Sequence, residues 1–511
     1  MGFKITRSKT IVCLLFVVAP VLVSIEHYKR NRQFYESIIK YHLQPLLQDP
    51  EDLHIFVASA HVLHNEFRPN TYTVRLNAMA RDLSVHLARH HSEVNGMYCK
   101  SDNGEVAQFR LYLMDAPPAC AWKNYFIDCE FLSPVEAVEI VSVDSSGTGF
   151  PIELTPNQIE KRNLVVCFAR TFYFENWQVL LVLFEIYRHH GVDQFVLPII
   201  SITEKIYEFL ERYKNYIILR LKKGFLLPEI KGLPNPNFET DSLNLILSSN
   251  ECLFEYRNSA EFLIFADTDD LILPNSGESL VDFARDLLSH NRMASSFEFM
   301  WKGIQFPIRH KAEAFSLTGI MNNTFTIRTN TIGKSILMPK RVAMAVIHAP
   351  WTSNQRVHPY EHIKFENGKV GSAFHMRFPV NEQDAEKWMK EKELKPLVDV
   401  DYSQADYELK LRLEKDAVLK TQFLSLDGYP VYYPLMVECW SQIVQFRGHG
   451  IDVCPTTKNC QPKSNTPLPS CVVLKSDFKA MTFERPTHLI SVYKPVEREL
   501  RVKEDCGFFE S

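Results

Sequence analysis

Short apolar segments alternate with longer helix-like segments between Leu164 and Ala266, and this alternation constrains the fold more than any other feature of the sequence. The apolar segments are Leu164–Phe168, Gln194–Ile200, Tyr216–Leu219 and Phe262–Ala266. Residues 176–190, 203–215 and 241–260 lie between them and have lengths and apolar spacings typical of helices. Repeated strand–helix units of this kind predict an α/β fold with a mostly parallel sheet flanked by helices.

The same pattern indicates where a ligand would bind. In open parallel sheets, ligands occupy the crevice at the carboxyl ends of the strands, near the point where the strand order reverses. The loops that follow Phe168 and Ala266 are therefore the first places to search for functional residues.

The start of the chain has a membrane-targeting pattern. Residues 11–25 carry no charge and follow Lys4, Arg7 and Lys9. We expect a retained anchor with a type II topology, because no small-x-small cleavage site follows the apolar run; a cleaved signal peptide is the alternative. The expected segments are a cytoplasmic tail (1–9), a transmembrane signal anchor (10–27) and a stem (28–50).

The remaining chain divides by composition. Short alternating segments broken by Pro and Gly predict a small β-rich region over residues 51–158. The strand–helix repeats define an α/β domain over 159–385. Residues 386–511 are first charged and helical and then rich in Pro and Cys, which indicates a peripheral region.

Charge and cysteine content restrict the partners and the compartment. A formal net charge of -4, with no basic run, argues against a nucleic-acid partner. Ten cysteines follow Cys13, and none forms a C-x-x-C pair, so disulfides in an oxidising compartment are expected rather than a structural zinc site. The sequon at Asn322 predicts glycosylation in the same compartment.

The strongest local signal is the acidic turn that follows the apolar segment Phe262–Ala266. Asp267, Asp269 and Asp270 stand within four residues at the expected end of a strand. Alternate carboxylates, Asp267 and Asp269, can face one site, and their oxygens suit Mg²⁺ or Mn²⁺ bridging a diphosphate. The alternative is a hydrated acidic turn that caps the next helix.

Several ordered motifs together resemble glycosyltransferase family 92. The resemblance covers roughly residues 160–380. It rests on Leu164–Arg170, Trp177–Gly191, Glu251–Arg257, Asp267–Asp270, Gly333–Pro339, His348 and His375–Arg377. The chain departs from the family pattern at Asp270, where Glu is usual, and at Met376, where Tyr is frequent.

The resemblance implies a GT-A-like fold and a Golgi-type transferase of the inverting class, anchored as a single-pass type II membrane protein with a lumenal catalytic domain. It implies UDP-galactose as donor, Mn²⁺ or Mg²⁺ as cofactor, and a glycan or glycoprotein as acceptor, with fucose of an N-glycan core as one candidate. Oligomeric state is not predicted.

Site residues follow from the matching positions. Asp267, Asp269 and His375 are the expected metal ligands. The expected donor-binding residues are Arg170, Asp267, Asp269, Lys334 and Arg377. His348 is a further candidate, and for each histidine and cation an ordinary structural or surface role is the alternative.

An inverting transfer requires a carboxylate that removes the acceptor proton. Asp270 and Glu298 are the two candidates for this catalytic base, and the sequence does not choose between them.

Two other functions fit parts of the pattern. Haloacid-dehalogenase-like phosphatases also place D-x-D after a strand, but Leu271 stands where Thr or Val is usual, and the motif lies late in this chain. A catalytically silent lumenal protein that binds a nucleotide-sugar or a glycan is the other alternative, because a fold does not guarantee turnover.

Overall fold

The computed structural model divides the chain into two units, residues 1–53 with 486–489, and residues 54–485 with 490–511. It describes residues 52–64, 70–81, 92–114, 119–142, 148–309, 311–346, 348, 350, 360–366, 368–376, 387, 391, 393–451, 453–456, 468–484, 489–504 and 506. The predicted tail, anchor and stem lie outside these residues. Within the described residues, no helix is both long enough and apolar enough to cross a membrane.

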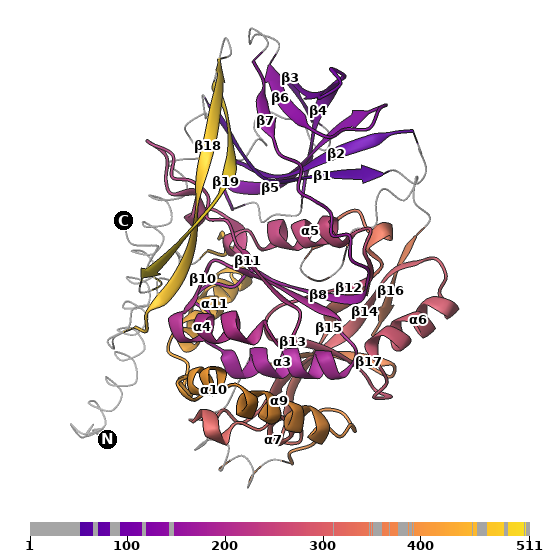
Figure 1. Cartoon of the computed structure of the whole chain (residues 1–511), viewed down its shortest axis with the longest axis vertical. Coiled ribbons are helices and arrows are strands. Elements are labelled where there is room, and N and C mark those ends of the chain that lie inside the picture. The colour runs from indigo at the N-terminus through magenta and orange to yellow at the C-terminus, as the bar shows by residue number, and fades with distance from the viewer. Residues whose placement is uncertain are drawn as a thin grey trace, which may run out of the picture. The chain divides into compact units, whose positions relative to one another are not determined.

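The larger unit contains a nine-stranded mixed sheet, which we call the central sheet (Figure 1). Its order is β11-β9-β8-β12-β15-β14-β17-β13, with β16 paired to β14. The strands are β8 (Arg162–Phe168), β9 (Gln194–Ile199), β11 (Leu219–Lys223), β12 (Ala260–Ala266), β13 (Asp270–Pro274), β14 (Ala294–Gln305), β15 (Phe325–Leu337), β16 (Glu361–Phe365) and β17 (Gly371–His375).

The strand directions confirm an α/β fold and show one feature that the sequence did not predict. β11, β9, β8 and β12 are parallel neighbours, as the strand–helix repeats predicted. β15 instead lies between β12 and β14 and runs antiparallel to both.

The first strands of the central sheet are buried on both faces. In β8, Leu164, Val166 and Phe168 face one apolar core, which also contains residues of α3 (Trp177–His189) and α4 (Glu204–Tyr213). Val165 and Cys167 face a second core with α5 (Leu245–Tyr256). Two-sided burial explains why these strands are continuous apolar runs rather than alternating ones.

Most predicted elements of this region lie where the periodicity placed them. The helices predicted over 176–190 and 203–215 are α3 and α4. Two boundaries were wrong. β11 begins at Leu219 rather than at residue 216, and the helix predicted over 241–260 is the shorter α5, preceded by a 3-10 turn at Asp241–Leu243.

The other helices pack around the same sheet or follow it in the chain. α6 (Leu280–His290) begins at Ser279, whose hydroxyl accepts a hydrogen bond from the Asp282 N–H, the usual N-cap interaction. α10 (Ala417–Leu424) begins in the same way at Asp416, which accepts from the N–H groups of Val418 and Leu419. Among the described residues, the remaining α-helices are α7 (Leu317–Met321), α9 (Ser403–Lys415) and α11 (Tyr432–Gly448).

The β-rich segment predicted over 51–158 does not form a sheet by itself. Its strands join strands from distant parts of the chain in a ten-stranded sheet, the second sheet, of order β10-β18-β19-β1-β2-β5-β4-β3-β6-β7 (Figure 1). They are β1 (Leu53–His64), β2 (Tyr72–Arg81), β3 (Ser92–Ser101), β4 (Val106–Leu113), β5 (Trp122–Phe131), β6 (Val138–Ser142), β7 (Phe150–Ile152), β10 (Ser201–Thr203), β18 (Cys471–Glu484) and β19 (Leu489–Glu504).

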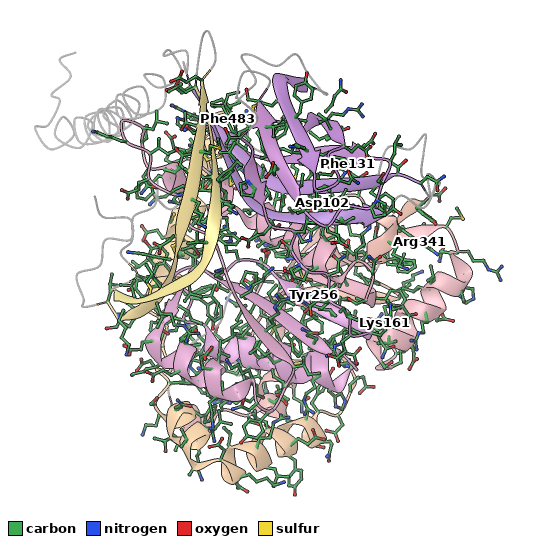
Figure 2. The ribbon with its side chains drawn as sticks, turned by 45° about the horizontal axis from the view of Figure 1, so that its top comes forward. Asp102, Phe131, Lys161, Tyr256, Arg341 and Phe483 are labelled. Carbon is green, nitrogen blue, oxygen red and sulfur yellow. A yellow bond between two sulfur atoms is a disulfide. The ribbon has the colours of Figure 1, made fainter. Side chains whose placement is uncertain are left out.

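Helix α5 lies between the two sheets. Asn77 of β2 donates a hydrogen bond to the carbonyl oxygen of Leu247, and the Leu247 side chain packs with Phe56 and Met79 of the second sheet. In Figure 2, Tyr256 at the end of α5 stands between the second sheet, marked by Phe131 and Phe483, and the central sheet.

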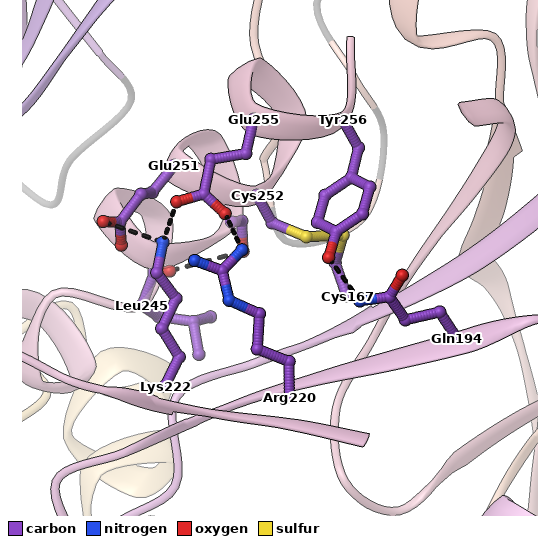
Figure 3. The surroundings of a disulfide bond; sticks show 10 residues. Cys167, Gln194, Arg220, Lys222, Leu245, Glu251, Cys252, Glu255 and Tyr256 are labelled. Atoms are coloured by element: carbon purple, nitrogen blue, oxygen red, sulfur yellow. Dashed lines mark hydrogen bonds and ion pairs between the residues drawn. A yellow bond between two sulfur atoms is a disulfide. The ribbon is translucent and has the colours of Figure 1, made fainter. Parts of the chain in front are cut away.

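A disulfide and three ion pairs fix α5 to the central sheet (Figure 3). Cys167 of β8 is bonded to Cys252 of α5. Lys222 and Arg220 of β11 point toward the same helix. Lys222 Nζ lies 2.5 Å from a Glu255 oxygen and 2.9 Å from a Glu251 oxygen, and Arg220 Nη1 lies 2.8 Å from Glu255. These ion pairs offset the cost of removing the two carboxylates of the helix from water.

The structure bears out the expectation of disulfides. The described bonds are Cys99–Cys129, Cys120–Cys454, Cys167–Cys252 and Cys471–Cys506. Cys120–Cys454 joins the segment before β5 to the segment after α11, which are 334 residues apart in the chain.

We predict that this long-range disulfide stabilises the fold more than the local one. A cross-link restricts the unfolded chain in proportion to the logarithm of the loop that it closes, here 334 residues against 30 for Cys99–Cys129. Replacing both Cys120 and Cys454 by Ala is therefore expected to cost about 2 kcal/mol more than the matched Cys99→Ala, Cys129→Ala double variant. Denaturant unfolding of both variants measures the difference, and equal losses would contradict the prediction.

Candidate active site

The acidic turn follows β12, at the carboxyl end of the parallel part of the central sheet. β8 is the parallel neighbour of β12, and the Ala169 N–H donates a hydrogen bond to the Ala266 carbonyl oxygen. The loops after these two strands therefore begin side by side, at the place that the strand pattern predicted for a ligand.

A cavity of about 700 Å³ opens at this point. Its lining includes six residues that the sequence analysis selected: Arg170, Asp267, Asp269, Lys334, His348 and His375. They come from the loops after β8 and β12, from β15 and the segment after it, and from the end of β17. The fold thus brings together residues more than 200 positions apart, in a volume suited to a small-molecule ligand.

Asp270 differs from the other two acids because it is buried beneath the turn. One of its oxygens lies 2.5 Å from His375 Nδ1, and the other lies 3.2 Å from Lys334 Nζ and accepts a hydrogen bond from the Asp267 N–H. Burial alone would raise the pKa of the Asp270 carboxyl, but Lys334 and His375 hold that pKa far below its ordinary value.

This position corrects one of the two predicted catalytic bases. Asp270 does not line the cavity, and both of its oxygens are engaged by the contacts just described. A carboxylate with a strongly lowered pKa is also a poor proton acceptor at neutral pH. Its position instead suits a structural role, in which it fixes Lys334 and His375 against the turn.

Glu298, the other predicted base, is also placed away from the cavity lining. It lies on β14, where Oε1 accepts a hydrogen bond of 2.7 Å from the Gly333 N–H and Oε2 lies 2.8 Å from His362 Nε2. Burial would raise the pKa of Glu298, but His362 and the Gly333 N–H lower it overall. Glu298 therefore links β14 to β15 and β16 rather than facing a substrate.

The close approach of the β14 backbone explains the glycine in the Gly333–Pro339 motif. A Cβ atom on Gly333 would lie 1.6 Å from the Phe299 carbonyl oxygen, so only glycine allows β15 to approach β14 this closely. The next residue is Lys334, which is buried, with Nζ 2.9 Å from an Asp267 oxygen. Burial alone would lower the pKa of Lys334, but Asp267 and Asp270 raise it above its ordinary value.

The group best placed to hold a metal ion differs from the predicted set by one residue. Asp269, Asp270 and His375 each bring a ligand atom within 4.8 Å of the others. Asp267, which was predicted in place of Asp270, lines the same cavity and is paired with Lys334, as Asp270 also is. Burial would lower the pKa of His375, whereas Asp269 and Asp270 raise it, so this imidazole lies in a negative environment that also suits a cation.

Arg170 is buried at the opposite side of the cavity. Its Nη1 donates hydrogen bonds to the carbonyl oxygens of Phe225 and Leu243. Its Nε and Nη2 atoms are also buried, and they have no hydrogen-bond partner in the described part of the chain. Burial lowers the pKa of Arg170 to about 10, with Glu251 acting in the opposite direction.

Three further predictions concern His348, Arg377 and Asn322. His348 lines the cavity but is not part of the group that brings Asp269, Asp270 and His375 together. Arg377 lies outside the described residues. Asn322, the predicted glycosylation site, is exposed at the end of α7.

The sequence analysis missed the cavity wall formed by α11. Tyr433, Met436, Val437 and Trp440 line the cavity at the i, i+3, i+4, i+7 spacing of one helix face. Glu175, in the loop after β8, accepts a hydrogen bond from the Tyr433 N–H at the start of this helix. The spacing is visible in the sequence, but nothing in it showed that α11 returns to the loop after β8.

Glu175 has an altered pKa because the start of α11 covers it. Burial raises the pKa of Glu175 to about 7, although backbone N–H groups of Val431, Tyr433 and Tyr432 act in the opposite direction. Above this pH its carboxylate is charged in a largely dry position.

We predict that Asp270→Asn destabilises the protein by about 3–5 kcal/mol at pH 7, because it breaks the buried ion pair with Lys334 and removes the carboxylate that contacts His375. Denaturant unfolding measures the change. The matched variant Asp269→Asn, whose side chain is 21% exposed, is expected to cost less than about 1 kcal/mol. Equal costs for the two variants would show that Asp270 has no special structural role.

A second prediction concerns pH. A folded-state pKa of about 7, against an ordinary value of 4.5, means that folding favours protonated Glu175. The contribution of protonated Glu175 to the free energy of unfolding is fully present below pH 4.5. It is lost as the pH rises through 7, by up to about 3 kcal/mol. Glu175→Gln, which stays neutral, should therefore match the wild type at pH 5 and exceed it in stability at pH 8. Thermal unfolding at both pH values tests this, with Glu438→Gln on the exposed face of α11 as the control; a constant difference between Glu175→Gln and the wild type would refute it.

Comparison with known proteins places this arrangement in a family. Residues 162–413 match the model of glycosyltransferase family 92. Curated proteins of the same family from Caenorhabditis elegans are 27% identical over 45% of this chain and 46% of the relative, and 21% identical over 84% of each chain. The chain thus spans about half the length of the first of these relatives.

Similarity to solved structures is remote. Staphylococcal TarS, residues 1–349 in complex with UDP, aligns with a TM-score of 0.23 and 11% identity, over 56% of this chain and 72% of that one, which supports no functional argument. The family match carries the assignment instead, since the matched residues include β8, the acidic turn, Lys334 and His375. The chain therefore belongs to glycosyltransferase family 92, with its family domain at residues 162–413.

Proposed function

We propose that this protein is a metal-dependent, inverting glycosyltransferase that moves a sugar from a UDP-sugar donor onto a hydroxyl group of a glycan. One observation carries the proposal. The lining of one cavity at the end of β8 and β12 includes carboxylates, an imidazole and cationic side chains together, among them Asp267, Asp269, His375, Lys334 and Arg170. This is the combination of charges that a metal–diphosphate complex requires.

The donor set supports a divalent cation. Asp269 and His375, with Asp270 beneath them, would hold the ion. Carboxylate oxygens suit both Mg²⁺ and Mn²⁺, and the imidazole favours Mn²⁺ as a transition ion. When bound, such an ion supplies positive charge that stabilises the diphosphate leaving group.

The residues of the chain have separate parts in this proposal. Asp270 keeps the His375 ring oriented toward Asp269, and Lys334 fixes the Asp267 carboxylate at the cavity edge. Arg170 lines the cavity in the loop after β8, where its positive charge would favour the nucleotide phosphates. We keep Arg377 as a candidate diphosphate ligand on the family resemblance alone.

The finer assignments rest on the family resemblance. They are UDP-galactose as donor, inversion at the anomeric carbon, and fucose of an N-glycan core as acceptor. The proposed location is the Golgi lumen, behind an anchor at residues 10–27; the apolar run at residues 11–25 and the disulfides of the described chain are consistent with it.

We predict that the full-length protein releases UDP from one member of a panel of UDP-sugars when Mn²⁺ and mixed N-glycans are present. EDTA should abolish the release, and Asp269→Ala should lower it by roughly two to three orders of magnitude, because the variant removes a charged group from the diphosphate site. Asp286→Ala, an exposed acid on α6, is the matched control and should leave the rate unchanged.

The alternative is a protein that binds a nucleotide-sugar or a glycan without turnover. Tight UDP binding in the absence of release from any donor would favour this alternative over the transferase. Release of inorganic phosphate from simple phosphomonoesters, without sugar transfer, would instead support the phosphatase hypothesis.

A further inference from the structure

One wall of the cavity, formed by β14 and β15, has features that the donor site does not explain. Trp301 of β14 and Arg328, Thr329 and Ile332 of β15 all line the cavity. We call Trp301, Arg328 and Ile332 the β14–β15 wall. Ile332 is 46% exposed although it is a large apolar residue, and Arg328 is also exposed.

The backbone is shaped so that Trp301 fits beside the metal group. The pairing of β14 with β15 shifts register between Phe299 and Trp301, and bulges of this kind re-aim side chains near functional sites. The Trp301 ring lies 4.8 Å from the His375 ring, measured between centroids. The Arg328 guanidinium lies over the Trp301 ring at 4.9 Å, within the range of a cation–π interaction.

Gly303 makes room for this stack. A Cβ atom at Gly303 would lie 3.1 Å from the Trp301 ring and 3.3 Å from the Arg328 side chain, so a larger residue would displace one of them. A register shift and a glycine thus combine to place one indole beside His375, with the exposed Arg328 outside it.

The strand order separates this wall from the nucleotide side of the cavity. The chain passes from β8 to β9 and β11 on one side of the sheet, and then returns to β12 on the other side of β8. The order reverses between β8 and β12, and the crevice there is the expected place for a nucleotide. β15 and β14 lie beyond β12, so the β14–β15 wall faces the reacting end of a donor bound in that crevice.

We propose that the β14–β15 wall is the acceptor subsite and binds a pyranose ring of the acceptor glycan. This inference rests on the proposed function and names the surface that recognises the second substrate. A pyranose has an apolar face of C–H groups and a rim of hydroxyls. The exposed side chain of Ile332 matches the apolar face, and the exposed guanidinium of Arg328, positioned over the buried Trp301 ring, supplies donors for the hydroxyls.

The test compares substitutions of exposed wall residues, because Trp301 also supports His375. Steady-state transfer with Mn²⁺, the UDP-sugar that is turned over, and mixed N-glycans gives separate KM values for acceptor and donor. Arg328→Ala is expected to raise the acceptor KM about tenfold, as the loss of a charged hydrogen-bond donor implies. Ile332→Ala should raise it by a smaller factor, and the donor KM of both variants should stay within about twofold of the wild type.

Arg285→Ala is the matched control, since this exposed arginine on α6 pairs with Glu261 outside the cavity. Its acceptor KM should not change. The proposal is overturned if Arg328→Ala and Ile332→Ala leave the acceptor KM unchanged, or if they raise the donor KM by the same factor.

A binding measurement separates this inference from the proposed function. The full-length protein, applied with Mn²⁺ and UDP to an array of N-glycans, should bind a subset of glycans, and Arg328→Ala should reduce that binding several-fold. Reduced binding in a protein that turns over no donor would refute the transferase and leave the subsite intact. Donor turnover with unaltered glycan binding by Arg328→Ala would refute the subsite alone.

Discussion

The candidate site depends on one buried carboxylate. Asp270 contacts Lys334 of β15, His375 of β17 and the backbone of the acidic turn, so a single side chain fixes three segments that converge on the cavity. A charge in this position is tolerated because its contacts with Lys334 and His375 offset the cost of removing it from water. Without it, Lys334 would keep Asp267 and His375 would keep Asp269 as a partner, but the contact that joins both residues beneath the turn would be lost. The positions of both residues follow from this one carboxylate.

The three acids of the acidic turn differ in burial and therefore in role. Asp269 faces the cavity, Asp267 is held at its edge by Lys334, and Asp270 lies beneath them. The same reasoning applies to Glu298, whose contact with the Gly333 N–H maintains the close approach of β14 and β15 rather than a proton-transfer position. Acids that look equivalent in the sequence therefore serve binding or architecture, according to which cations and N–H groups surround them.

The walls of the cavity extend beyond the segment that matches the family. The matched residues end at 413, yet α11, at Tyr432–Gly448, supplies four lining residues, and Glu175 of the matched segment binds its first turn. The C-terminal part also completes the second sheet and is bonded to its N-terminal half through Cys120–Cys454. Differences outside the family segment can therefore alter the pocket without altering the charged residues at its centre.

The sequence by itself determined the parallel part of the central sheet, its helices and the acidic turn. Strands that are buried on both faces must be apolar at every position, so segments such as Leu164–Phe168 can be recognised in the sequence. With the family resemblance it also identified Arg170, Lys334 and His375. Tertiary structure alone decided which acid is buried. Asp267, Asp269 and Asp270 are the same residue type, and their environments differ only because folding places Lys334 of β15 and His375 of β17 beside them. It also decided the contacts of Trp301 with Arg328 and of Glu175 with α11. These contacts join residues 27 and 258 positions apart, and no local pattern encodes which distant segment a side chain will meet.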